Sequence, residues 1–99
     1  MPKFKLTNKA VLDLSDIWDY TYETWNERQA DKYYKNIISE CKSISKNPEK
    51  GRLYDTLITN LRGFKTNKHI IFYRIIDNNI IEVERILHEK MDLKKYFNK

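Results

Sequence analysis

The spacing of apolar residues changes in the middle of this chain, and that change constrains the fold more than any other feature of the sequence. Before Asn47-Pro48 the apolar residues recur at helical spacing, as in helices that bury one face. After Gly51 they alternate or run together as β-branched and aromatic residues, which is typical of strands. Helices followed by strands, rather than alternating with them, predict an α+β fold.

A short strand and a first helix are expected at the start. Phe4 and Leu6 alternate with lysines, as in a strand, and Thr7 or Asn8 can cap the helix that follows. We expect the apolar stripe of this helix to be core, and it consists of Val11, Leu14, Trp18, Tyr22 and Trp25, widened by Ala10, Ile17 and Thr21. The opposite, polar face carries Asp13, Asp16, Asp19 and Glu23.

A second helix follows after a brief break at residues 26–29. Its apolar stripe consists of Ala30, Tyr33 or Tyr34, Ile37, Cys41 and Ile44. It should end at Asn47, because Pro48 disfavours helical geometry in the residue before it. Since the break is short, the two helices are expected to form an antiparallel hairpin.

An antiparallel β-meander of about three strands is expected after Gly51. Residues 53–58 are ambiguous between a strand and an irregular return, whereas residues 61–66 and 70–76 have the composition of strands. Residues 77–79 supply a turn, and residues 80–87 return as the last strand of a hairpin. Residues 88–98 are polar and Lys-rich, and we expect a short helix or tail in which Met91, Leu93, Tyr96 and Phe97 pack down.

Strict alternation along the last strand predicts its two faces. It puts Ile81, Val83, Arg85 and Leu87 on one face and Ile80, Glu82, Glu84 and Ile86 on the other. A charge such as that of Arg85 on an apolar face must be paired or open to solvent. Asp92 or an acidic residue of the first helix could pair it, and the helices can cover one face of the sheet while leaving the other open.

Length and composition limit the class of protein. A chain of 99 residues is expected to form a single domain, residues 1–99, without a large internal cavity. Cys41 is the sole cysteine, so an intramolecular disulfide is excluded, and its isoleucine neighbours predict a buried, inert thiol. The N-terminus lacks the apolar run of a signal peptide, and no stretch approaches a membrane span, so a cytoplasmic location is expected.

The charge balance favours an acidic partner. Lys and Arg number 19 against 14 Asp and Glu, which gives a net charge of +5. Such a small basic chain suits nucleic acid, a nucleoprotein complex or an acidic protein. The alternative is that the lysines only keep the chain soluble, since they are spread rather than clustered.

These features, taken in order, resemble the RelE/ParE toxin fold, and specifically its ParE branch. The matching segments are residues 10–21 of the first helix, Pro48…Gly51-Arg52, Leu61-Arg62-Gly63-Phe64, Phe72-Tyr73-Arg74 and Arg85-Ile86-Leu87-His88-Glu89-Lys90-Met91-Asp92. The last is close to the Arg-(Ile/Val)-Leu-His-x-Arg-x-Asp signature that closes ParE chains. Two positions depart from the pattern: Lys90 stands where ParE chains commonly carry Arg, and Tyr96 where many carry His.

The resemblance implies the toxin of a type II toxin–antitoxin system. ParE toxins inhibit DNA gyrase, stabilise its cleaved-DNA state and arrest growth, without a catalytic site of their own. A cognate ParD-like antitoxin would bind the toxin directly in a hetero-oligomer, and operator DNA would be bound only through that antitoxin. Candidate contacts with the target or the antitoxin are Arg52, Arg62, Arg74, Arg85, His88, Lys90 and Asp92.

Two alternatives stay open. A ribosome-dependent mRNA endonuclease of the RelE/YoeB type needs a general base, cations for the phosphorane and an acid. Its candidates are His88 as base or acid, the cations Arg62, Arg74, Arg85 and Lys90, and Tyr96 as a weak acid. The other is a ParE-like module that keeps antitoxin binding but has lost toxicity. The sequence contains no Gly-rich phosphate loop, histidines at metal spacing or nucleophile arrangement, so we expect no cofactor or metal.

Overall fold

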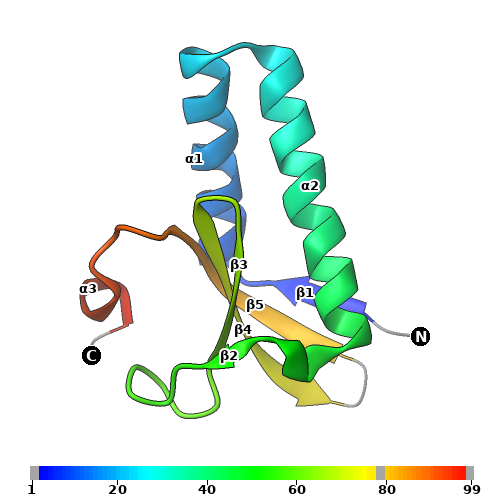
Figure 1. Cartoon of the computed structure of the whole chain (residues 1–99), viewed down its shortest axis with the longest axis vertical. Helices are drawn as coiled ribbons and strands as arrows, with labels where there is room; N and C mark the ends of the chain where they lie inside the picture. Colours follow the sequence, from blue (N-terminus) through cyan, green and yellow to red (C-terminus); the bar gives the residue numbers. More distant parts are fainter. Residues whose placement is uncertain (1–2, 78–79, 98–99) are drawn as a thin grey trace.

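The helix hairpin expected from the first half of the sequence is present in the computed structural model, which describes residues 3–77 and 80–97 (Figure 1). Helix α1 spans Asn8–Thr24 and helix α2 spans Glu27–Lys46. The Thr7 hydroxyl caps α1 by accepting a hydrogen bond from the Ala10 amide, so the first of the two expected caps is used. The Asn26 side chain caps α2 in the same way, through the Gln29 amide.

The second half of the chain forms the sheet. After the 3-10 turn η1 (Pro48–Lys50) come β2 (Arg52–Leu53), β3 (Arg62–Thr66), β4 (His69–Asp77), β5 (Ile80–His88) and the short helix α3 (Leu93–Phe97). With β1 (Lys3–Leu6), the described strands lie in the order β1-β5-β4-β3-β2. β1 runs parallel to β5, and the other neighbours are antiparallel. Asn78 and Asn79 of the expected turn lie outside the described residues.

The expected alternation along β5 is wrong beyond Val83. Phe72 of β4 pairs with Arg85 and Tyr73 pairs with Val83, so Glu84 is an extra residue in β5, a β-bulge. The bulge reverses the alternation. Ile86 therefore joins the cluster of Ile81 and Val83 under the helices, and Leu87 belongs to a cluster on the other face.

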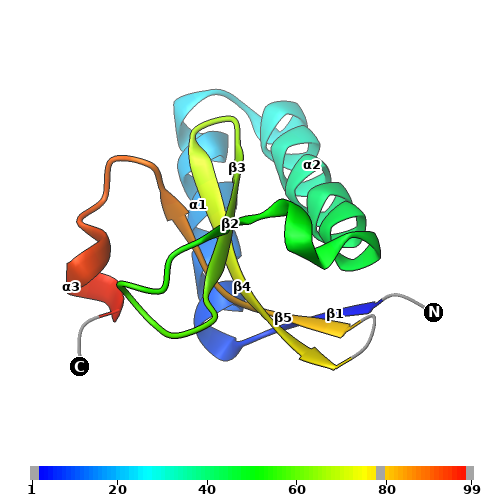
Figure 2. The same ribbon diagram turned by 60° about the horizontal axis from the view of Figure 1, so that its bottom comes forward.

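Two apolar clusters cover the two faces of the sheet. The larger lies between the helices and the sheet and includes Leu14, Ile37, Ile71 and Val83. The second face had been expected to be open. Instead, residues 54–61 and α3 pack on it. There the ring of Phe72 meets that of Tyr54 at 5.2 Å and that of Phe97 at 5.0 Å between centroids. Figure 2 shows α3 lying apart from the helix hairpin.

The expected core stripe of α1 is only partly buried. Ala10 and Leu14 are buried, but Val11, Tyr22 and Trp25 are 49%, 49% and 71% exposed. The apolar stripe of α1 is thus wider than the part of the helix that α2 and the sheet cover. On α2 the expected stripe is confirmed, with Tyr33 packed against the core and Tyr34 exposed.

A buried tyrosine joins the sheet to the segment that follows α2. The Tyr73 hydroxyl donates to the Pro48 carbonyl oxygen at 2.5 Å and accepts from the Gly51 amide at 3.0 Å. Burial raises the pKa of Tyr73, so the hydroxyl keeps its proton. A Cβ atom at Gly51 would overlap this hydroxyl, which explains why glycine occupies the position.

We predict that Tyr73→Phe destabilises the fold. The change leaves the Gly51 amide and the Pro48 carbonyl without their partner in a buried place, which costs about 1–3 kcal/mol of unfolding free energy. Urea unfolding followed by circular dichroism measures this. Tyr34→Phe, at an exposed position of α2, is the matched control and should stay within about 0.5 kcal/mol. Equal stability of both variants would contradict the assigned role of Tyr73.

Candidate functional site

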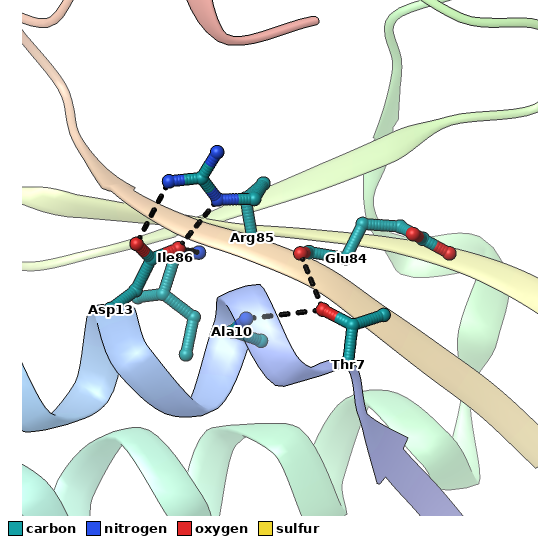
Figure 3. Close-up of polar contacts among 6 residues, drawn as sticks. All are labelled: Thr7, Ala10, Asp13, Glu84, Arg85 and Ile86. Atoms are coloured by element: carbon teal, nitrogen blue, oxygen red, sulfur yellow. Dashed lines mark hydrogen bonds and ion pairs between the residues drawn. The ribbon is translucent and has the colours of Figure 1, made fainter.

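The edge of β5 changes its partner halfway along its length. β1 pairs with β5 only as far as Val83, and in the described structure no strand continues along Glu84–His88 on that side. The start of α1 takes over (Figure 3). The Thr7 amide and hydroxyl donate to the carbonyl oxygens of Val83 and Glu84 at 3.1 and 2.8 Å, and Asp13 accepts from the Ile86 amide at 3.0 Å.

Asp13 also holds Arg85. The guanidinium donates through Nε at 2.8 Å and through Nη2 at 2.9 Å to the two carboxylate oxygens. The side chains of Arg85 and Asp13 are only 16% and 11% exposed, and the hydrogen bonds to Asp13 raise the pKa of Arg85. Its guanidinium also lies 5.1 Å from the ring centroid of Tyr96 in α3.

These contacts decide between the expected partners of Arg85. The partner is an acidic residue of the first helix, whereas Asp92 is exposed. Asp13 belongs to the polar face expected for that helix, and this part of the face meets the edge of β5.

The other candidate arginines also have partners. Arg62 donates through Nη1 to the carbonyl oxygens of Gly51 and Glu49 at 2.8 and 3.2 Å, and so holds the segment after α2. Arg74 forms ion pairs across the β4–β5 ladder with Glu84 at 3.2 Å and Glu82 at 3.8 Å. Arg52 is exposed, with its guanidinium 5.4 Å from the ring centroid of Tyr54.

Two histidines and a tyrosine meet at the end of the β4–β5 ladder nearest the helices. His69 and His88 face each other across the strands, with ring centroids 5.3 Å apart. The Tyr33 hydroxyl from α2 lies 2.6 Å from His69 Nδ1. Burial, and then the charge of His88, lower the pKa of His69 from 6.5 to about 4, so it is neutral at pH 7 and its Nδ1 can accept from Tyr33.

Sequence reasoning had not connected His69 with Tyr33. The two residues are 36 positions apart, and the apolar spacing of α2 explains Tyr33 as a core residue without a polar partner. The pairing depends on the tertiary fold, so no local signal in the sequence could have found it.

A groove of about 840 Å³ lies between the helix hairpin and this end of the sheet. We call it the hairpin groove; its ring-bearing lining residues are Tyr20, Trp25, Tyr33, His69 and His88. Of the site candidates taken from the sequence, it brings together His88 and Lys90. The arginines, Asp92 and Tyr96 are not among its described lining residues, so the candidates do not form one cluster.

Metal ligation and membrane insertion find no support in the described residues. Across residues 3–77 and 80–97, no three His, Cys, Asp or Glu side chains gather as a metal site would require. None of the helices in that part of the chain has both the length and the apolar character of a membrane span. Cys41 is buried as expected, and burial raises its pKa to about 12, so it remains an unreactive thiol.

Known proteins resemble this chain in both sequence and fold. The family described as "ParE toxin of type II toxin-antitoxin system, parDE" matches residues 4–93. Toxin ParE1 of Mycobacterium tuberculosis is 31% identical over 93 residues, which are 94% of this chain and 95% of that protein. Toxin ParE1 of Caulobacter vibrioides is 28% identical over 96 residues, 97% and 98% of the two chains.

A solved structure, "Chromosomal ParDE TA system from P. aeruginosa", has the same fold. It superposes with a TM-score of 0.73 and 21% identity, over 89% of this chain and 96% of the other. Fold and sequence together define a toxin of the RelE/ParE superfamily, which confirms the resemblance seen in the sequence. Within that superfamily, this chain belongs to the ParE toxin family of type II toxin–antitoxin systems.

We predict that Asp13→Asn lowers the free energy of unfolding by about 2–3 kcal/mol, because Arg85 loses a charged partner in a largely buried place. Urea unfolding measures the change. Asp19→Asn, an exposed position of the same helix, is the control, with an expected effect within about 0.5 kcal/mol. If Asp13→Asn were as mild as Asp19→Asn, the junction would not stabilise the fold as described.

His69 predicts a pH dependence of stability. Its pKa is about 4 in the folded protein and near the ordinary 6.5 in the unfolded chain. Between these values the unfolded chain binds a proton that the folded protein does not, so stability is fully present above pH 6.5 and falls as the pH drops toward 4. Urea midpoints measured above about pH 5.5 keep the contribution of ordinary carboxylates small, and comparison with a His69 variant removes what remains, including that of Glu84, whose pKa burial raises.

His69→Gln should flatten this dependence, whatever its effect on absolute stability. His88→Gln is the control and should keep most of the slope, because burial is the larger cause of the shift. An unchanged slope in His69→Gln would show that His69 does not titrate as assigned.

Proposed function

We propose that this chain is the toxin of a type II pair that arrests growth by inhibiting DNA gyrase, without catalysing a reaction itself. Membership of the ParE family supports a toxin, and the resemblance to ParE chains supplies gyrase as the target. The contacts of the arginines are the observation that favours gyrase inhibition over RNA cleavage.

An mRNA-cleaving toxin needs free cations beside a general base and an acid. Here Arg62, Arg74 and Arg85 are held by backbone carbonyls or carboxylates. Such arginines are poorly placed to follow a developing phosphorane charge, because their donors already serve the fold. His88 lines the hairpin groove, whereas Tyr96 is not among its described lining residues and lies 5.1 Å from the Arg85 guanidinium, which supports the non-catalytic reading over a base and an acid placed about one phosphodiester.

One observation favours the second candidate, a ribosome-dependent mRNA endonuclease. His88 and Lys90, a possible base and a cation, both line the hairpin groove. Lys90 is exposed, and the His88 Nδ1 atom accepts a hydrogen bond from the Lys90 amide at 3.1 Å. Lys68 also lines the groove, but Tyr96 and the three held arginines are not among its described lining residues, so the groove supports the alternative more weakly.

The partner we propose is a ParD-like antitoxin that binds this chain directly in the cytoplasm. A net charge of +5 favours an acidic segment, and the exposed apolar side chains of α1 offer a surface that such a segment can cover. Operator DNA would then be bound through the antitoxin. Arg52, Lys90 and Asp92, which are exposed, are the accessible members of the contact set that we propose.

We predict that antitoxin-free protein inhibits gyrase supercoiling and traps linear DNA, while mRNA in a parallel translation reaction stays intact. Both reactions are read on gels, with the same protein after addition of its antitoxin as the control. Ribosome-dependent mRNA cuts with normal supercoiling would contradict the proposal and make His88 and Lys90 the first catalytic suspects. Inactivity in both reactions, from folded protein, would instead support a module that has lost toxicity.

A further inference from the structure

The hairpin groove continues into a second hollow, and the two form one positively charged track. The second hollow lies where α2 meets the β3–β4 turn, and it shares Gln29, Tyr33 and Asn67 with the groove. The cations along the track are Lys32, Lys35, Lys68 and Lys90. Among the described lining residues, Asp16 is the sole carboxylate, so the track carries a surplus of three positive charges.

Glu89, an acidic residue beside the track, is itself paired with a lysine. Glu89 follows His88, and its carboxylate forms an ion pair with Lys65 at 2.6 Å. Lys68 and Lys90 are exposed, and no ion pair within 4.0 Å joins either of them to a described carboxylate. Their charge therefore remains available to an anionic ligand.

Flat rings, rather than aliphatic side chains, dominate the apolar lining. Tyr20 and Trp25 are each 71% exposed, although a large ring is usually covered in a free protein. Trp18 provides the contrast on the same helix: it stacks on Tyr22 and donates to Asp31 through Nε1 at 3.1 Å. Trp25 therefore offers a ring face that Trp18 does not.

We propose that this track binds an unpaired nucleic-acid strand, with bases stacked on the rings of Tyr20 and Trp25 and phosphates near the lysines. Exposed rings beside a row of cations are the pattern by which proteins hold single strands without reading their sequence. An acidic peptide would satisfy the lysines, but the exposed rings also offer flat faces on which bases can stack. The contact differs from operator binding through an antitoxin, because a duplex keeps its base faces stacked and out of reach.

The binding of a short labelled oligothymidylate to the antitoxin-free toxin tests the proposal by fluorescence anisotropy at low salt. Oligouridylate and a duplex of equal length are measured in parallel, which separates DNA from RNA as the source of the strand. Trp25→Ala should weaken binding about tenfold through the lost stacking. Trp25→Phe, which keeps a ring, should restore most of it. Lys68→Ala with Lys90→Ala should weaken binding and lower the salt dependence by about 0.7 per lost phosphate contact.

The chain offers matched controls. Lys42→Ala with Lys46→Ala removes the same charge from the opposite end of α2, and Tyr34→Ala removes an exposed ring that does not line the track. Both should leave binding nearly unchanged. All variants replace exposed side chains, and circular dichroism checks that each is folded.

Several results would overturn the proposal. One is that neither oligonucleotide binds. Another is that the double variant of Lys42 and Lys46 weakens binding as much as the double variant of Lys68 and Lys90. A third is that the duplex binds more tightly than the single strands. Binding of polyglutamate without binding of oligothymidylate would assign the track to an acidic protein. Since the assay contains no gyrase, its failure leaves the proposed inhibition of gyrase to be judged by supercoiling alone.

Discussion

The contacts of Asp13 join the helix hairpin to the edge of the sheet. β1 is too short to accompany β5 beyond Val83, so the rest of that edge needs another partner. Asp13 accepts from the Ile86 amide and from two nitrogens of Arg85, and so ties α1 to the sheet where no strand can. The position of the helix hairpin over β5, and the groove between them, follow from this junction.

The bulge at Glu84 determines the direction in which Arg85 points. It turns Arg85 away from the side chains of Ile81 and Val83, toward the face where Tyr96 lies, while its guanidinium still reaches Asp13 at the strand edge. Arg85 thus links α1, β5 and α3. Arg62 and Arg74 are held by carbonyls and carboxylates in the same manner. Lysines, rather than arginines, therefore supply the accessible charge around the hairpin groove.

Local patterns in the sequence predicted much of this fold, and its long-range contacts much less. Both helices, a cap at Thr7 or Asn8 and the strands after Gly51 follow from periodicity and capping, which are properties of neighbouring residues; the structure uses Thr7. The parallel pairing of β1 with β5 and the contact of Tyr33 with His69 join distant segments, so no local pattern indicates them. The faces of β5 were assigned wrongly because one inserted residue reverses an alternation. The apolar spacing of α1 predicted a helix correctly. It could not show that Tyr22 and Trp25 stay exposed, because that depends on which parts of the helix the rest of the fold covers.

The central claim is that Arg62, Arg74 and Arg85 of this ParE chain serve the fold and do not act on the target. The direct measurement replaces the Asp13–Arg85 pair as a unit, by Asp13→Asn with Arg85→Met. An asparagine oxygen can still accept from the Ile86 amide, and an apolar side chain in place of a largely buried ion pair is often tolerated. The variant is expressed without antitoxin, its folding is checked by circular dichroism, and growth is followed. We expect a folded protein that still arrests growth; a folded variant without toxicity would show that the Arg85 guanidinium itself contacts the target.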